Sequence, residues 1–220
     1  MVEVIMIVCL AVILFIMMRK FPSTAEVEEN EPKKIKKDTP VVEAKVIKPI
    51  TEAKPKYTSD VEKLLNEARK LIDDDKRQAA EDKLIEAVQI DLKCATAYTL
   101  LGDIYLKRRK NNEAEEAYKA AIKNDPEEAA AHFGLGLILE DAGRLNDAVK
   151  EVIAATRIDG TNDIWYHREG ELYMNLRMYS KAAMAYNRAA NLRPDYTRYK
   201  ELALQADKKQ VSHKIQSRQQ

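Results

Sequence analysis

Several kinds of protein chemistry lack their usual residues in this sequence. It contains 3 histidines, and nowhere do His, Cys and carboxylate residues recur at the spacing of a metal site. Its 6 glycines form no phosphate-binding loop, and no nucleophile–base pair is suggested by the residues. We therefore expect no metal or other cofactor, and we expect that the protein is not an enzyme.

Cysteine is also scarce, and neither sign of charge is in excess. The 2 cysteines, Cys9 and Cys94, cannot build a disulfide framework, which favours a reducing compartment for the folded part. Lysine and arginine together number 37 and aspartate and glutamate 36, so the net charge is +1. Because no overall field attracts polyanions, nucleic acid is not an expected partner.

The longest apolar run lies at the amino terminus. Residues 4–18 are all apolar, and Glu3 is the one charged residue before Arg19. A helix of 18 residues reaches roughly 27 Å, about the thickness of the hydrocarbon core of a bilayer. Residues 1–20 are therefore predicted to be a transmembrane anchor. The alternative is a cleavable secretory signal, which normally has its basic residues before the apolar run rather than after it.

Basic residues predict the orientation of this anchor. Arg19, Lys20 and the lysines within residues 33–37 all come after the apolar run. The positive-inside rule then places the rest of the chain in the cytoplasm, as a single-pass protein of the inner or plasma membrane. The lysines of residues 33–37 have two interpretations, contact with anionic lipid or a solvated stretch beside acidic residues, and we favour the second.

Residues 21–57 differ in composition from the rest of the chain. They contain no glycine and no sustained helical period, and five of the 7 prolines fall in them: Pro22, Pro32, Pro40, Pro49 and Pro55. Proline at such intervals prevents a long helix. We predict a disordered linker, with an end-to-end distance on the order of 30–40 Å.

A pattern with a period of 34 residues dominates the remainder, and its clearest copy runs from Tyr98 to Pro126. Bulky residues alternate with small ones that allow two helices to approach each other. The small residues recur at Ala68, Gly102, Gly136 and Gly170, at Ala80, Ala114, Ala148 and Ala182, and at Ala87, Ala121, Ala155 and Ala189, while Pro126 and Pro194 close second helices. A period of this length indicates stacked helix pairs.

These residues resemble the tetratricopeptide repeat (TPR), whose pattern is W-x2-L-G-x2-Y, then A-x3-F, then P. The resemblance implies an all-α solenoid of four helix-turn-helix units at about 61–94, 95–128, 129–162 and 163–196. The first unit departs most from the pattern, because Glu67 and Ala68 replace the Leu-Gly pair. Its second helix is nevertheless in register, and Ser59 with Glu62 is predicted to form a capping box at its start.

A solenoid needs a cap on its last apolar face. Residues 196–209 are predicted to supply one, as a helix with a single apolar side made of Tyr199, Leu202, Ala203 and Ala206. The solenoid with its cap is therefore expected to occupy residues 58–209, and residues 210–220 are expected to be a flexible tail.

The resemblance also implies a right-handed superhelix whose concave groove is formed by the first helix of each pair. The residues expected there are Arg69, Ile72, Thr99, Asp103, Leu106, Phe133, Leu137, Glu140, Ile164, His167, Glu171 and Met174. Its apolar members would form a strip of the kind that marks a binding surface. We expect a protein or peptide partner that is apolar with some basic residues. Alternatively, neighbouring helices or the chain's own tail cover part of the strip.

Three other features have more ordinary interpretations. His132 stands at the position in its repeat that Tyr98 and Tyr166 hold in the neighbouring repeats, so it is expected to pack in the core. Trp165 is expected to pack between repeats, and the carboxylates of residues 73–75 to form a solvated turn.

One family subtype clamps a peptide's carboxylate with Lys, Asn and Arg. Of those positions, only Arg168 matches here, so a receptor for chaperone tails is not expected.

Together these features predict a membrane-tethered scaffold or adaptor that binds a protein or peptide partner in its groove. An anchor followed by repeats is similar to membrane-anchored bacterial TPR proteins that assemble the cell envelope, although the metal-binding cysteines of such scaffolds are missing here. Two alternatives remain open. One is an export, pilus or envelope assembly factor with its repeats outside the cytoplasm, and the other is a self-associating structural protein.

Overall fold

The computed structural model describes residues 56–217, and this part of the chain consists of helices and loops with no strand. The predicted anchor at 1–20 and nearly all of the predicted linker lie outside the described residues. Within residues 56–217, no helix combines the length and the apolar character needed to cross a membrane.

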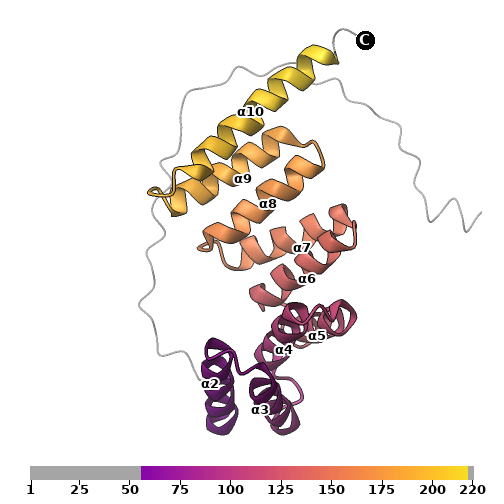
Figure 1. Ribbon diagram of the computed structural model, residues 1–220, viewed down its shortest axis with the longest axis vertical. Coiled ribbons are helices and arrows are strands. Elements are labelled where there is room, and N and C mark those ends of the chain that lie inside the picture. Colours follow the sequence, from indigo (N-terminus) through magenta and orange to yellow (C-terminus); the bar gives the residue numbers. More distant parts are fainter. Residues whose placement is uncertain (1–55, 218–220) are drawn as a thin grey trace, which may run out of the picture. The chain divides into compact units, whose positions relative to one another are not determined.

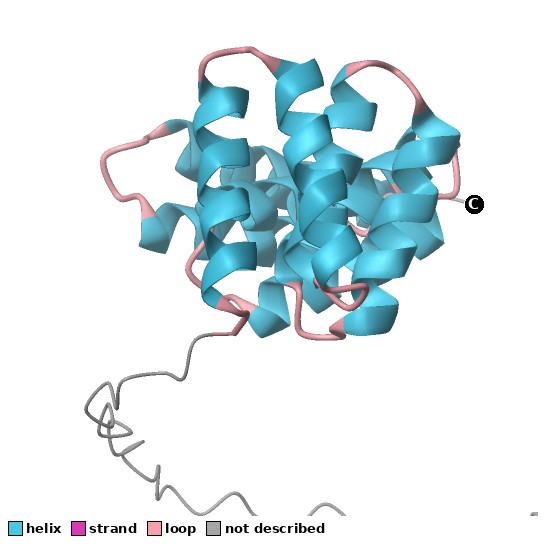
Figure 2. Cartoon of the chain, turned by 90° about the horizontal axis from the view of Figure 1, so that it is seen from below, coloured by secondary structure: helices cyan, strands magenta, loops and turns pink. Residues whose placement is uncertain are grey.

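The described residues form four helix pairs and one final helix (Figure 1). The pairs are α2 (Ser59–Asp73) with α3 (Arg77–Ile90), α4 (Ala95–Lys107) with α5 (Asn111–Asn124), α6 (Ala129–Asp141) with α7 (Leu145–Ile158), and α8 (Asp163–Asn175) with α9 (Tyr179–Leu192), followed by α10 (Arg198–Gln216). Each pair falls in one of the four predicted units and contacts the next pair. The predicted all-α solenoid is confirmed, and Figure 2 shows the same helices seen from below.

Small residues stand where the two helices of each pair cross. A Cβ atom added at Gly102 would lie 2.6 Å from Cε1 of Tyr118, and one at Gly170 would lie 2.5 Å from Cε1 of Tyr186. At Gly136 the added atom would lie 2.7 Å from Cγ2 of Val152. Since real Cβ atoms do not approach so closely, glycine is required for these rings and branches to fill the crossing. The three glycines therefore occupy equivalent crossings, as their spacing predicted.

The recurring alanines form the packed centre of the stack. Each has no exposed surface: Ala68, Ala80, Ala87, Ala114, Ala121, Ala148, Ala155, Ala182 and Ala189. Alanine suits these positions because it favours the helix and leaves room for the facing backbone. Pro126 and Pro194 each stand two residues beyond the end of a second helix, where the missing N–H breaks no helical hydrogen bond.

The turn inside each pair contains a residue in the left-handed region. These residues are Asp75, Arg109, Gly143 and Arg177, with φ of 58°, 59°, 73° and 57°. In each turn the next residue donates its N–H to a carbonyl five positions back, as Lys110 does to Tyr105 (3.0 Å). This Schellman arrangement satisfies carbonyls that the first helix leaves free at its end.

The links between pairs are closed by aspartate side chains. Asp91, Asp125 and Asp159 end the second helices in extended conformation. Each accepts a hydrogen bond at 2.9 Å from the backbone N–H two residues later. Such turns set the direction in which the chain enters the next pair.

Two local predictions were wrong. Ser59 does not cap α2, because it is already its first helical residue; Thr58 is the N-cap, and no side chain caps it. At the other end, α10 continues to Gln216, beyond the predicted end at residue 209. No glycine or proline interrupts this stretch, and the rings of Tyr179 on α9 and His213 lie 5.9 Å apart.

Candidate functional site

The residues predicted to line the groove all lie on first helices. We call the surface formed by α2, α4, α6 and α8 the first-helix face. Helix α4 contacts α6, and side chains described below join α6 to α8. By helix, the set consists of Arg69 and Ile72 (α2), Thr99, Asp103 and Leu106 (α4), Phe133, Leu137 and Glu140 (α6), and Ile164, His167, Glu171 and Met174 (α8).

A shallow pocket of about 290 Å³ lies at the α2 end of this face, and Arg69 lines it. Its wall includes Lys56 and Tyr57, which precede α2. The Nζ atom of Lys56 lies 2.7 Å from Asp125 and 2.9 Å from Glu128, and the hydroxyl of Tyr57 lies 3.2 Å from that of Thr96. The residues just before α2 are therefore bonded to the start of α4 and to the link that precedes α6. Burial lowers the pKa of Lys56, but its hydrogen bonds with these carboxylates outweigh that effect and raise it.

Two predicted groove residues on α4 are engaged in the fold itself. Thr99 is 3% exposed, and its hydroxyl donates to the carbonyl of Ala95 (3.1 Å). It belongs to the helix packing rather than to an exposed surface, because a hydroxyl bonded within its own helix turns away from solvent. Asp103 accepts a 2.6 Å hydrogen bond from the hydroxyl of Tyr118. Burial raises the pKa of Asp103, against the effect of that hydrogen bond.

Aromatic rings gather at the α8 end of the first-helix face. Phe133 on α6 stacks on Trp165 on α8 with ring centroids 5.5 Å apart, so Trp165 packs between repeats as predicted. His167 lies 5.8 Å from the ring of Tyr186 and 5.4 Å from that of Tyr199. Tyr199 on α10 also donates to Asp163 (2.6 Å), and burial together with this hydrogen bond raises the pKa of Tyr199 to about 12.

Charged residues beside these rings join α6 to α8. Arg168 lies 3.7 Å from Glu140 and 3.0 Å from Glu171. Burial raises the pKa of Glu140; Arg168 opposes this, while Glu171 and Asp141 add to it. Of the predicted apolar residues, Ile164 is 52% exposed, whereas Phe133 and Met174 are half-buried. The exposed part of the predicted strip is therefore short and is flanked by carboxylates.

His132 does more than fill space. Its Nδ1 lies 2.7 Å from a carboxylate oxygen of Glu151, and its Nε2 lies 3.1 Å from the carbonyl of Pro126. Both ring nitrogens therefore face acceptors, which favours the doubly protonated ring. The hydrogen bond with Glu151 raises the pKa of His132, although burial opposes it. The sequence suggested a packing role, and the structure adds a link between α6 and α7.

Helix pairs repeating every 34 residues, with small residues at the crossings, define an α-solenoid of helix-turn-helix units. Residues 99–163 and 166–196 match family models described as tetratricopeptide repeat. The chain therefore contains tetratricopeptide repeats. The pair α2–α3 precedes the matched residues, yet it shares the left-handed turn and the buried alanines of the later pairs.

Two curated proteins resemble parts of this chain. A probable UDP-N-acetylglucosamine–peptide N-acetylglucosaminyltransferase, SPINDLY of Hordeum vulgare, is 34% identical over 125 residues, which are 54% of this chain and 13% of that protein. Anaphase-promoting complex subunit 3 of Schizosaccharomyces pombe is 27% identical over 106 residues, which are 48% of this chain and 16% of that protein. This chain thus spans less than a fifth of either relative.

Solved structures share the fold at low sequence identity. PilF of Pseudomonas aeruginosa gives a TM-score of 0.62 at 15% identity, covering 73% of this chain and 72% of that one. A tetratricopeptide repeat protein of Parabacteroides merdae gives 0.58 at 16% identity, covering 71% and 62%. MamA gives 0.54 at 17% identity, covering 70% of this chain and 97% of that one. At such identities these likenesses concern the fold alone.

Proposed function

We propose that this protein is a scaffold or adaptor that binds a protein or peptide segment on its first-helix face. The observation that carries the proposal is the set of residues that α6 and α8 present together: exposed Ile164, the Phe133–Trp165 stack, and Glu140 and Glu171 joined by Arg168. Aromatic residues are the usual anchors of protein interfaces. The name of the fission-yeast relative, which describes it as a subunit of a complex, is consistent with such a role.

The charges define the partner further. Burial and neighbouring carboxylates raise the pKa of Glu140, so the site gains from an additional positive charge. Arg168 supplies one cation for both Glu140 and Glu171. A partner segment that inserts an apolar side chain against Ile164 and brings a Lys or Arg to these carboxylates fits the surface best.

The test uses Ile164→Glu, which adds a charge at an exposed position and should leave the fold intact. Proximity labelling in the native host identifies neighbours of the wild-type protein, and we expect the variant to lose at least one of them. Ile85→Glu, at an α3 residue that is 41% exposed, is the matched control on another face. An unchanged set of neighbours for Ile164→Glu, with unchanged circular dichroism, would contradict the proposal.

We further propose that the scaffold is tethered to a membrane by residues 1–20, with the repeats in the cytoplasm. The apolar run at 4–18 and the basic residues after it support this. The alternative is an export, pilus or cell-envelope assembly factor whose repeats lie outside the cytoplasm. Gln205→Cys at an exposed position of α10, in a Cys9→Ser background, distinguishes them, since Cys94 is buried. Labelling of intact cells by a membrane-impermeant reagent would contradict the cytoplasmic orientation.

Self-association is a second candidate, favoured by the outer side of α10. Leu204, Val211 and Ile215 are 55%, 59% and 52% exposed and fall on one side of this helix. A second copy could cover them, because large exposed apolar residues gathered on one side often mark an interface. Light scattering of residues 56–220 should then give a dimer or larger species that Leu204→Lys with Val211→Lys dissociates. A wild-type monomer at all concentrations would exclude this candidate.

A further inference from the structure

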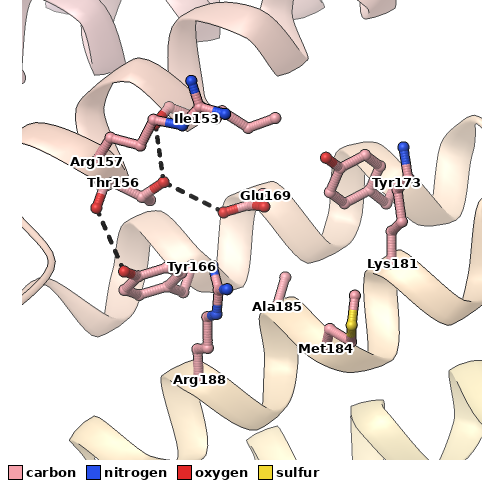
Figure 3. A pocket seen from close by; sticks show the side chains of 10 residues that line it. All are labelled: Ile153, Thr156, Arg157, Tyr166, Glu169, Tyr173, Lys181, Met184, Ala185 and Arg188. Carbon is pink, nitrogen blue, oxygen red and sulfur yellow. Dashed lines mark hydrogen bonds between the residues drawn. The ribbon is translucent and has the colours of Figure 1, made fainter. Parts of the chain in front are cut away.

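A pocket of about 540 Å³ lies between α7, α8 and α9 (Figure 3). It is separate from the first-helix face. Helix α8 contributes Glu169 and Tyr173 to the pocket, whereas His167 and Glu171 of the same helix belong to the first-helix face. Its volume is within the range of sites for small molecules.

Two polar residues in this pocket stand where the repeat pattern has apolar ones. Glu169 takes the position of Leu101 and Leu135 in the two preceding repeats, where the first repeat has the more exposed Glu67, and Thr156 takes the position of Ile122. Glu169 is 7% exposed, and its Oε2 accepts one long hydrogen bond, 3.3 Å, from the hydroxyl of Thr156. A carboxylate buried in place of leucine costs free energy of folding. Departures of this kind are typical of functional positions.

Three cations line the same pocket: Arg157, Lys181 and Arg188. All three are exposed, and within residues 56–217 none of them forms an ion pair. Two are held against aromatic rings instead. The Nζ atom of Lys181 lies 5.5 Å from the ring centre of Tyr173, and Cζ of Arg188 lies 5.7 Å from that of Tyr166. Cation–π contacts of this kind hold a cation in place. Burial raises the pKa of Glu169, and the positive charges of Arg188 and Arg157 oppose that rise.

The two sets of charges together limit the ligand. A simple cation that reached Glu169 would be repelled by three positive side chains, and a simple anion would meet the carboxylate of Glu169. A molecule with both features avoids each conflict: its anionic group pairs with Arg157, Lys181 and Arg188, and its donor bonds to Glu169. Figure 3 shows Glu169 between Thr156 and Tyr173, with Arg188 beside Tyr166.

We propose that this pocket binds a small organic anion that also carries a hydrogen-bond donor. Two sources share this chemistry, an acidic amino acid and a phosphorylated sugar. In the first the donor is an ammonium group, and in the second it is a hydroxyl. The pocket presents three positive side chains and one negative side chain, so a ligand of net negative charge is favoured in both cases.

Calorimetric titration of the full chain tests the proposal with three probes. L-glutamate represents the amino acid, glucose 6-phosphate represents the phosphorylated sugar, and glutarate is matched to glutamate but lacks the ammonium group. We expect one of the first two to bind at least about tenfold more tightly than glutarate, the size of effect that one charged hydrogen bond produces. Whichever of them binds identifies the source.

Variants of the pocket residues test whether these residues bind a ligand or only stabilise the fold. Glu169→Leu restores the residue of the preceding repeats, so it should fold at least as stably and lose binding. Glu169→Gln keeps the size of the side chain and should weaken binding at least about tenfold, as should Lys181→Gln with Arg188→Gln. Ile164→Glu on the first-helix face should not change it. The proposal is overturned if neither L-glutamate nor glucose 6-phosphate binds at roughly 10 mM. It is also overturned if glutarate binds as tightly as the better of these two, or if Glu169→Leu leaves binding unchanged.

Discussion

Tyr118 shows how one side chain joins two repeats. Its ring fills the space left by Gly102 in its own repeat and by Gly134 in the next, and its hydroxyl donates to Asp103. Tyr186 takes the same place two repeats later, opposite Gly170, and no hydrogen bond of its hydroxyl is found within the described residues. The two tyrosines therefore share the packing against the glycine of their own repeat, and Tyr118 has in addition the hydrogen bond to Asp103 and the contact with Gly134.

We predict that Tyr118→Phe lowers the free energy of unfolding by about 1–3 kcal/mol, because it leaves the half-buried carboxylate of Asp103 without its donor. Tyr186→Phe is the matched control and should lower it by much less. Urea unfolding followed by circular dichroism measures both. Equal losses in the two variants would mean that the hydrogen bond to Asp103 contributes nothing beyond ring packing.

His132 makes stability depend on pH. The hydrogen bond with Glu151 raises its pKa above the ordinary 6.5. Because the pKa of His132 is higher in the folded state than in the unfolded state, its protonated ring stabilises the fold. This contribution is complete at pH values below the unfolded-state pKa and is lost as the pH rises through the folded-state pKa. We therefore predict that wild-type stability falls across this interval above pH 6.5, and that His132→Gln removes this slope. NMR titration of the His132 ring should give a pKa above 6.5, and a lower value would refute the prediction.

At the scale of elements, the four turns within pairs present a natural comparison. All contain a left-handed residue, but only the third uses glycine, at Gly143. A Cβ atom added there meets nothing within 4 Å. The effect of a substitution is therefore purely conformational, since left-handed backbone costs an L-residue roughly 1–2 kcal/mol.

We predict that Gly143→Ala destabilises the protein by about 1 kcal/mol, and that Arg177→Gly at the same place in the next pair stabilises it by a smaller amount, because glycine also gains entropy in the unfolded chain. Thermal unfolding of the two variants should shift the midpoint in opposite directions. Shifts of the same sign would show that side-chain contacts of these residues outweigh the backbone.

The sequence predicted the helix pairs well because each crossing requires a small residue, and the 34-residue period makes that requirement visible. It did not reveal the left-handed turns, since Arg109 and Arg177 resemble any exposed loop residue. Asp91, Asp125 and Asp159 do recur with the 34-residue period. Their role in the turns was not predicted, because a side chain that bonds to the backbone two residues later produces no hydrophobic pattern. The available signals of the pocket were Glu169 and Thr156, two polar residues at positions where the preceding repeats have leucine and isoleucine.

At the scale of the whole described unit, the buried side chains fall into separate clusters. One joins α2, α3 and α4 with Ala117 of α5 and includes Leu84, while a larger one extends from α5 to α10 and includes Leu172. Both leucines have no exposed surface. In a solenoid each pair contacts only its neighbours, so stability is expected to vary along the stack.

We predict that Leu84→Ala and Leu172→Ala each cost about 2–5 kcal/mol, but in different places. Leu84→Ala should increase amide hydrogen exchange in α2, α3 and α4 more than in α8 and α9, and Leu172→Ala should do the reverse. The two variants are each other's control, because the chemical change is the same. Hydrogen exchange measured by mass spectrometry at a mildly destabilising temperature resolves the segments. An equal increase throughout residues 56–217 in both variants would show one cooperative unit, and the separation of these two clusters would then have no energetic meaning.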